Sequence, residues 1–328
     1  MAARHHTRLA LALLWSALAA SIAQAAAPSA PYPTRPIRFL VGFSTGGVND
    51  IISRILAHEL TGSLGQQVVV DNRAGANGII ANGIAASAAP DGHTMLLVPT
   101  SFAIDMARGA RSPYDGMKDF ATVTQLATGP LVLVVHHAFP ARSVRELVDL
   151  LRTKPGSLSY GHAGNGNLTH IAVEMFKAMT GTEAVAVAYK GGGAALTDIG
   201  GGQVQFGIPT LPPALVHIRA GRVRALGVTS GKRTSVLPDV PTLDEAGVAG
   251  YQATAWWGVL VPRGTATHVI QALHRHIAGA LQQPQAREKL AALGAEGVGS
   301  TPSQFRTHLK EETQRWQKVI QQTGLQIP

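Results

Sequence analysis

The stretch Ile37-Arg-Phe-Leu-Val-Gly-Phe-Ser-Thr-Gly-Gly-Val-Asn-Asp50 decides the fold, because it contains a strand, a glycine loop and the start of a helix. Residues 37–43 are a largely apolar run, which is typical of a strand buried on both faces. Over residues 50–60, apolar side chains then recur at helical spacing on one face. This order of elements indicates an α/β protein.

The same unit recurs along the chain. Further strands are expected at residues 67–70, 94–98, 131–135, 184–189, 204–208 and 223–229, and helices at 78–88, 143–152, 168–179, 194–199 and from Pro212. Strands that alternate with helices of this length predict parallel sheets covered on both faces.

The pattern changes after Thr229. Residues 242–245 predict a capping box that opens a short helix, residues 257–261 a lone strand, and residues 268–281 and 302–322 two helices. Thr301 and Gln304 predict the cap of the last helix. We therefore expect two lobes, one built from residues 33–130 plus 251–328 and the other from residues 131–250. A cleft between such lobes is a favoured ligand site.

The N-terminal residues are typical of a secretory signal. Arg4 and Arg8 precede an apolar run over residues 9–20, and Ala23-Gln-Ala25 follows as a cleavage motif. The run is shorter than the roughly 20 residues that cross a bilayer. We expect residues 1–25 to be removed and the mature protein to reside in the periplasm.

Composition excludes several classes of function. The chain has no cysteine, which excludes thiol catalysis, iron–sulfur clusters and cysteine zinc sites. The formal net charge is +9, but the basic residues are scattered singly, so we expect no nucleic-acid partner. The thirteen histidines contain no His-Glu-x-x-His motif, and we expect neither a metal nor a cofactor.

Three strand–glycine–helix junctions carry the chemistry that the sequence offers. They span residues 41–50, 160–170 and 189–193. The first amides of a helix lack internal partners and carry partial positive charge, and glycines let that backbone close around an anion. Lys190 is the only cation in these junctions. Neutral donors of this kind predict a carboxylate ligand.

An exported serine hydrolase is the alternative that these residues leave open. Gly42-Phe-Ser-Thr-Gly46 fits the Gly-x-Ser-x-Gly nucleophile elbow, with Ser44 as its nucleophile. However, this motif follows the first strand, and the oxyanion loop of such enzymes is missing. Gly164-Asn-Gly166 lacks the third glycine of a dinucleotide fingerprint. We therefore expect a binding protein and not an enzyme.

Motifs along the whole mature chain resemble those of the tripartite tricarboxylate transporter substrate-binding proteins, the Bug or TctC family. They are Tyr32-Pro-Thr-Arg-Pro-Ile37, Gly46-Gly47 with Asp50, Asp71-Asn-Arg-Ala-Gly75, Pro90-Asp-Gly92, Lys118-Asp-Phe120, Gly164-Asn-Gly166 with His170, Tyr189-Lys-Gly191, Asp198, Pro238-Asp-Val-Pro-Thr242, Glu245-Ala-Gly247 and Trp257-Gly258. The resemblance implies a two-lobed type II periplasmic-binding-protein fold, each lobe a sheet flanked by helices. It also implies a monomeric receptor for an organic acid, aromatic acid or amino acid.

The resemblance further implies which residues bind the ligand. One wall comprises Phe43, Ser44, Thr45, Gly46, Gly47 and Asp50, and the other comprises Ala163, Gly164, Asn165, Gly166, Asn167 and His170. Thr100, Ser101, Pro209, Thr210 and Leu211 are expected to contact the rest of the ligand. Asp50 and His170 each have a second interpretation, because Asp50 also suits a helix N-terminus and His170 also suits a bond to local backbone.

Departures from the family pattern leave the ligand open. Ser44-Thr45, Asn77, His93, Asn167 and Ala188 replace residues that the family usually has. The partner is open too, because a receptor of this kind serves either the membrane subunits of a tripartite tricarboxylate transporter or a membrane sensor kinase. The fold also occurs in cytoplasmic transcription regulators, but the signal segment and the missing DNA-binding module argue against that class.

Overall fold

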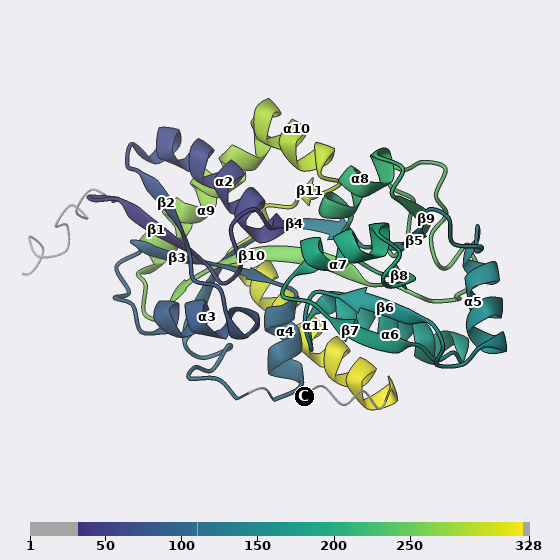
Figure 1. The fold of residues 1–328 in the computed structure, drawn as a ribbon. Coiled ribbons are helices and arrows are strands. Elements are labelled where there is room, and N and C mark those ends of the chain that lie inside the picture. Colours follow the sequence, from purple (N-terminus) through teal and green to yellow (C-terminus); the bar gives the residue numbers. More distant parts are fainter. Residues whose placement is uncertain (1–31, 110, 324–328) are drawn as a thin grey trace, which may run out of the picture. The chain divides into compact units, whose positions relative to one another are not determined.

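The computed structural model describes residues 32–109 and 111–323 of the 328-residue chain. The expected signal segment, residues 1–25, lies outside the described residues. From Arg35 onward the chain forms two sheets flanked by helices (Figure 1), which confirms the predicted α/β fold class. In the part of the chain that is described, no helix is both long enough and apolar enough to cross a membrane.

The first sheet has six strands in the order β11-β4-β10-β3-β1-β2. They are β1 (Ile37–Val41), β2 (Val68–Asn72), β3 (Thr94–Pro99), β4 (Phe120–Pro130), β10 (Thr254–Pro262) and β11 (Glu296–Gly297). β1 is parallel to β2 and β3, whereas β10 is antiparallel to β3 and β4. Segments from both ends of the described chain therefore share one sheet.

Helices cover both faces of this sheet (Figure 1). They are α2 (Val48–Leu64), α3 (Ile79–Ala86) with the short helix η1 (Ala76–Gly78), α4 (Ser101–Ala107), α9 (Thr267–Gln282), α10 (Pro284–Ala292) and α11 (Pro302–Thr323). α2, α9 and α10 pack together on one face, and α4 and α11 pack together on the other. The predicted cap of α11 is confirmed, because the amide of Gln304 donates to Thr301 Oγ1 and the amide of Thr301 donates to Gln304 Oε1.

The second sheet has five strands in the order β7-β6-β8-β5-β9. They are β5 (Val132–His136), β6 (Ser159–His162), β7 (Val185–Ala188), β8 (Phe206–Gly207) and β9 (Val223–Val228), and the helices around them are α5 (Val144–Thr153), α6 (Leu168–Thr180), α7 (Gly192–Gly200) and α8 (Leu211–Arg219). An apolar core that includes Val132, Leu196 and Leu215 joins β5 to α7 and α8. Burial of such side chains stabilises a fold by about 1.5–3 kcal/mol each.

Thr229 joins the two connections that run between the sheets. Its Oγ1 accepts a hydrogen bond from the amide of Leu131, which follows β4, and donates to Ala253 O, which precedes β10. Its backbone pairs with the same two residues. Thr229 is fully buried. The two crossing segments are thus tied side by side at one point.

The predicted secondary structure needs three corrections. Both sheets are mixed and not all parallel, because β10 is antiparallel to β3 and β4 in the first sheet and β5 is antiparallel to β8 and β9 in the second. β4, α4 and α10 were not predicted, and β4 carries Thr122, Thr124 and Gln125 in place of an apolar run. The short helix expected at residues 242–245 is a turn, although Thr242 and Glu245 do exchange the two bonds of a capping box.

Candidate functional site

The first glycine loop, residues 42–47, joins β1 to α2 and is held in place by Asp50. Gly46 has a left-handed backbone (φ +81°), and its amide donates to Asp50 Oδ2 at 2.9 Å. Gly47 is the N-cap of α2, and within the described chain no side chain caps this helix. The amides of its first turn are therefore available to an anion. Phe43 is half-buried, and residues 44–47 are exposed.

Asp50 organises this loop from the inside. It is only 2% exposed, and its carboxylate accepts hydrogen bonds at 3.0 Å from Arg54 Nε. Burial acts to raise the pKa of Asp50, but hydrogen bonds from Arg54, Gly46 and Asn72 outweigh it and lower the pKa below its usual value. Asn72 also donates through Nδ2 to Phe43 O at 3.0 Å. The ionised Asp50 thus supports the loop and neutralises Arg54.

Asn72 and Arg54 are absent from the set of residues predicted from sequence. Asn72 ends β2, which is parallel to β1, and Arg54 lies one turn after Asp50 on α2. Because parallel neighbours end at the same edge of a sheet, a polar residue at the end of β2 was a usable signal. The helical spacing of Asp50 and Arg54 was another, since residues four apart are neighbours on a helix.

A second loop, residues 75–78, packs directly behind the first. Gly75, Ala76, Asn77 and Gly78 all have positive φ, between +46° and +144°. A Cβ on Gly42 would lie 2.6 Å from Gly78 Cα, so the two backbones touch where only glycine fits. Backbone held in such sparsely populated conformations is typical of functional sites. This loop belongs to the site, although Asn77 was noted from sequence only as a departure from the family.

The loop that precedes α6, residues 163–167, has fewer free backbone amides than the sequence predicts. Asn167 caps α6 with its own side chain, since Oδ1 accepts from the amide of Thr169 at 3.1 Å. The amide of Gly164 donates to His162 Nδ1 and that of Gly166 to His170 Nδ1, both at 3.3 Å. Several backbone amides of this loop therefore already have hydrogen-bond partners within the protein, and the exposed residue of the loop is Asn165.

His162 and His170 form a stacked pair beneath this loop, with ring centroids 4.2 Å apart. Burial, with a smaller contribution from His162, lowers the pKa of His170 to about 4, and burial also lowers the pKa of His162. Both rings are thus neutral at pH 7, which leaves each Nδ1 able to accept a backbone amide. Of the two interpretations of His170, the geometry favours the bond to local backbone. His162 was not predicted.

The third junction, residues 189–193, packs beside the loop that precedes α6. A Cβ placed on Gly164 would lie 3.7 Å from Tyr189 O, and a Cβ placed on Gly192 would lie 4.0 Å from Ala163 Cβ. Gly191 is the N-cap of α7, and no side chain of the described chain caps that helix. α7 therefore offers the free amides that α6 does not, while Lys190 at its approach is exposed.

The remaining predicted residues contribute in different ways. Thr100 Oγ1 accepts the amide of Trp256 at 2.8 Å, so this hydroxyl ties β3 to β10. Ser101 Oγ is buried without a hydrogen-bond partner among the described residues, which is unusual for a polar atom. Pro209 O accepts the amide of Val132, Thr210 bridges to Leu131, and Leu211 is fully buried in the core of the second sheet.

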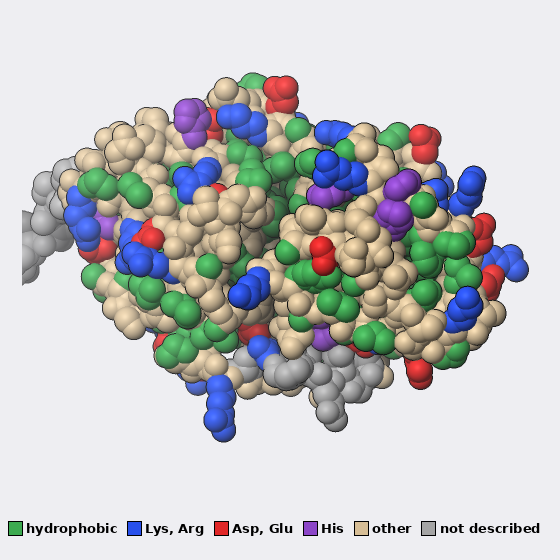
Figure 2. All heavy atoms as spheres, in the orientation of Figure 1, with side chains coloured by type: hydrophobic (Ala, Val, Ile, Leu, Met, Phe, Trp, Pro, Cys, Tyr) green, Lys and Arg blue, Asp and Glu red, His purple; other side chains and the backbone are tan. Residues whose placement is uncertain are grey.

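Within the described residues, Ser44 lacks the histidine partner that a serine nucleophile requires. Its side chain is exposed, and no hydrogen bond in the described residues joins Ser44 Oγ to a histidine. The basic side chains form no single large patch on the visible face: Figure 2 shows Lys and Arg side chains spread across it and interspersed with acidic ones. Neither observation favours a hydrolase or a nucleic-acid surface.

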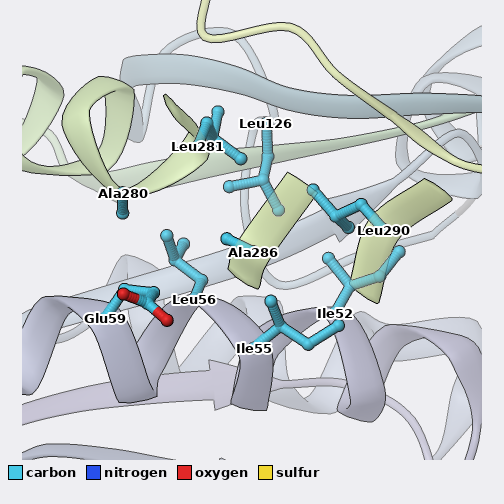
Figure 3. Close-up of a pocket in the computed structure, with 9 residues that line it drawn as sticks. All are labelled: Ile52, Ile55, Leu56, Glu59, Leu126, Ala280, Leu281, Ala286 and Leu290. Carbon is cyan, nitrogen blue, oxygen red and sulfur yellow. The ribbon is translucent and has the colours of Figure 1, made fainter. Parts of the chain in front are cut away.

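An apolar cavity of about 10 Å³ lies apart from these loops, between α2, α9, α10 and β4 (Figure 3). Its lining residues are Ile52, Ile55, Leu56, Glu59, Leu126, Ala280, Leu281, Ala286 and Leu290. A space of this size holds at most about one water-sized sphere. It is a packing defect between helices and not a candidate for the ligand site.

Comparison with known proteins agrees with this architecture. The family described as "Tripartite tricarboxylate transporter family receptor" matches residues 52–325. Protein BugT of Bordetella pertussis is 38% identical over 298 residues, which cover 90% of this chain and 91% of BugT.

Two solved structures are similar over nearly the whole chain. An R. palustris protein determined with adipate has a TM-score of 0.85 and 36% identity, and the match covers 89% of this chain and 98% of that one. MatC from Rhodopseudomonas palustris, determined with bound malate, has a TM-score of 0.82 and 30% identity, over 88% of this chain and 100% of that one.

Proposed function

Because the chain belongs to the tripartite tricarboxylate transporter family of receptors, we propose that it captures a small carboxylate-bearing solute between its two lobes. The proposal places the mature protein in the periplasm as a monomer, after removal of residues 1–25. Its lobes are residues 33–130 plus 251–328 and residues 131–250, and its partners are the membrane subunits of a tripartite transporter. It catalyses no reaction and uses no cofactor.

The observation that carries the proposal is the contact between successive loops from both sheets. Loop 42–47 touches loop 75–78 at Gly42, and Asn77 of that loop meets Asn167 at 3.5 Å. The loop that contains Asn167 then packs against residues 189–193. Two helices that start in these loops, α2 and α7, lack side-chain caps. Their N-termini are suited to an anion.

The charges in these loops favour a carboxylate over a more densely charged anion. Arg54 is already bound to Asp50, and Lys190 is exposed at the approach to α7. Phosphate groups are typically held by bidentate arginine forks, whereas the guanidinium of Arg54 already donates to Asp50 and Asn72. Backbone dipoles equivalent to about half a charge per helix suit one or two carboxylates.

Two relatives indicate which solutes to test first. Adipate and malate, found in the two R. palustris structures, are both small dicarboxylates. The unpartnered hydroxyl of Ser101 supports a ligand that carries a further polar group, because a buried hydroxyl gains from a hydrogen bond.

The test is a thermal-shift screen of the mature protein with adipate, malate, tricarboxylates, aromatic acids and amino acids, each beside its amide. A ligand that binds only the folded state at a hundredfold excess over its Kd stabilises it by about 2.7 kcal/mol. We expect at least one acid to raise the Tm by several degrees and its amide to have little effect. If only sugars or cations raise the Tm, the carboxylate site is wrong.

A further inference from the structure

Two asparagine side chains bring the two lobes into contact at the candidate site. Asn167 Nδ2, from the loop before α6, lies 3.5 Å from Asn77 Oδ1, from the loop after β2. The two residues are 90 positions apart and lie in loops that follow strands of different sheets. Both are half-buried.

We propose that Asn77 and Asn167 form an amide bridge between the lobes that stabilises the conformation able to hold a ligand. The inference deepens the proposed function, and its consequence for ligand affinity rests on that function. It assigns both residues a positioning role.

The neighbours of each amide determine which way it points. Asp105 Oδ2 accepts from Asn77 Nδ2 at 3.1 Å, so Asn77 must turn its oxygen away from α4. The amide of Thr169 donates to Asn167 Oδ1 at 3.1 Å, so Asn167 must turn its nitrogen away from α6. A donor from one lobe therefore faces an acceptor from the other. Each lobe orients its own amide before the two meet.

The resulting chain of hydrogen bonds is continuous from α4 to α6. It begins at Arg108, which donates through Nε to Asp105 Oδ1 at 2.9 Å, and passes through Asn77 and Asn167 to the first turn of α6 at Thr169. Hydrogen bonds in such a chain polarise one another. Asn77 is also fixed by its backbone, since its left-handed φ of +54° is one that asparagine tolerates better than most residues.

The bridge lies at the ligand loops and not where the chain crosses between lobes. Tyr251 also donates its hydroxyl to Ala172 O on α6 at 2.7 Å, but Tyr251 belongs to the connection that leads into β10. A contact at that connection persists when the lobes separate, whereas the asparagine contact must break. The 3.5 Å separation is at the long limit of a hydrogen bond, so the bridge biases the equilibrium between conformations and does not lock it.

The experiment measures the distance between the lobes in ligand-free protein. The chain has no cysteine, so Val69→Cys on β2 and Val216→Cys on α8, which are 53% and 69% exposed, provide a unique pair of spin labels. Double electron–electron resonance then gives the interlobe distance distribution. The variants are Asn77→Gly, which suits a positive φ, and Asn167→Ser, which retains a helix cap without the amide nitrogen.

We expect each variant to lower the ratio of bridged to separated molecules by about three- to tenfold, the usual effect of one hydrogen bond. The double variant should lower it no further than either single variant, because one bond is lost in all three. Asn167→Asp retains the cap oxygen but places an acceptor against Asn77 Oδ1, so its effect should exceed that of Asn167→Ser.

Identical distributions in all variants, or effects that add in the double variant, would overturn the bridge. Circular dichroism and Tm values verify that each variant is folded before its distances are compared. If adipate binds, its Kd should rise in inverse proportion to the fraction of molecules that are bridged. If no carboxylate binds, the proposed function fails while the ligand-free distances still decide whether the bridge exists.

Discussion

Replacing Gly46 by alanine tests whether the first glycine loop contacts the ligand. Gly46 has φ +81°, its amide donates to Asp50, and a Cβ placed on it meets nothing within 4 Å. A left-handed backbone costs a residue with a Cβ about 1–2 kcal/mol. At about 2.1 cal/mol/K of unfolding entropy per residue, that corresponds to a fall in Tm of roughly 1.5–3 °C for a chain of this length. The added methyl group would occupy the open space that the ligand is expected to fill.

Gly250 is a matched control for this substitution. It has φ +76°, its amide donates to Asp244 Oδ1 at 2.7 Å, and its Cβ would also meet nothing within 4 Å. Gly250→Ala should therefore lose a similar amount of stability.

The two variants should differ in thermal-shift titrations with a carboxylate that stabilises the wild type. Gly250→Ala should retain the full ligand-induced rise in Tm, and Gly46→Ala should lose most of it. The reasoning is refuted if Gly46→Ala retains the ligand response, or if both variants lose it equally.

Three further outcomes follow from the structure. Glu312 is buried and accepts the indole N–H groups of Trp256 and Trp316, each at 3.0 Å, so Glu312→Ala should lower the free energy of unfolding in urea by about 2–4 kcal/mol and Glu312→Gln by less. Burial and His162 lower the pKa of His170 to about 4, below its unfolded value near 6.5, so its neutral ring stabilises the fold above about pH 6.5 and that stability is lost as the pH falls toward 4. Between pH 7.5 and pH 5 the loss should be about 2 kcal/mol, and urea unfolding of His170→Asn should show a smaller loss; an equal loss contradicts the assignment. A fluorophosphonate probe should leave Ser44 unlabelled, and labelling that Ser44→Ala removes would restore the hydrolase alternative.

The sequence predicts the elements of this fold wherever burial dictates the residue pattern. β1 is predictable because both of its faces are covered, which demands an apolar run, and α2 because one face packs against the sheet. β4 is not predicted because it lacks an apolar run. The hydroxyls of Thr122 and Thr124 donate to backbone carbonyls of residues 302 and 300, so specific hydrogen bonds replace apolar packing at these positions. Such partners lie about 180 positions away, and local pattern does not reveal them.

The candidate site was predictable only as far as the position of its loops. Glycines after strands indicate where backbone approaches a ligand, but they do not show which amides remain free. Asn167 occupies the start of α6, and two histidine rings take the amides of Gly164 and Gly166. These bonds depend on side-chain rotamers and on the packing of His170 against His162. The same holds for Asn77, whose partners on α4 and before α6 meet only in the folded chain.

In the proposed site, the pairing of Arg54 with Asp50 would let an anion bind without being held permanently. A lone guanidinium beside the first loop would form a bidentate ion pair with a carboxylate, and desolvated pairs of this kind are costly to break. Asp50 occupies that guanidinium and simultaneously orients the amide of Gly46. The ligand is then left with dipoles fixed by the loop, whose attraction is weaker than that of a full charge. Because Asp50 orders the loop before binding, we expect capture to cost little entropy and a moderate attraction to be sufficient for affinity.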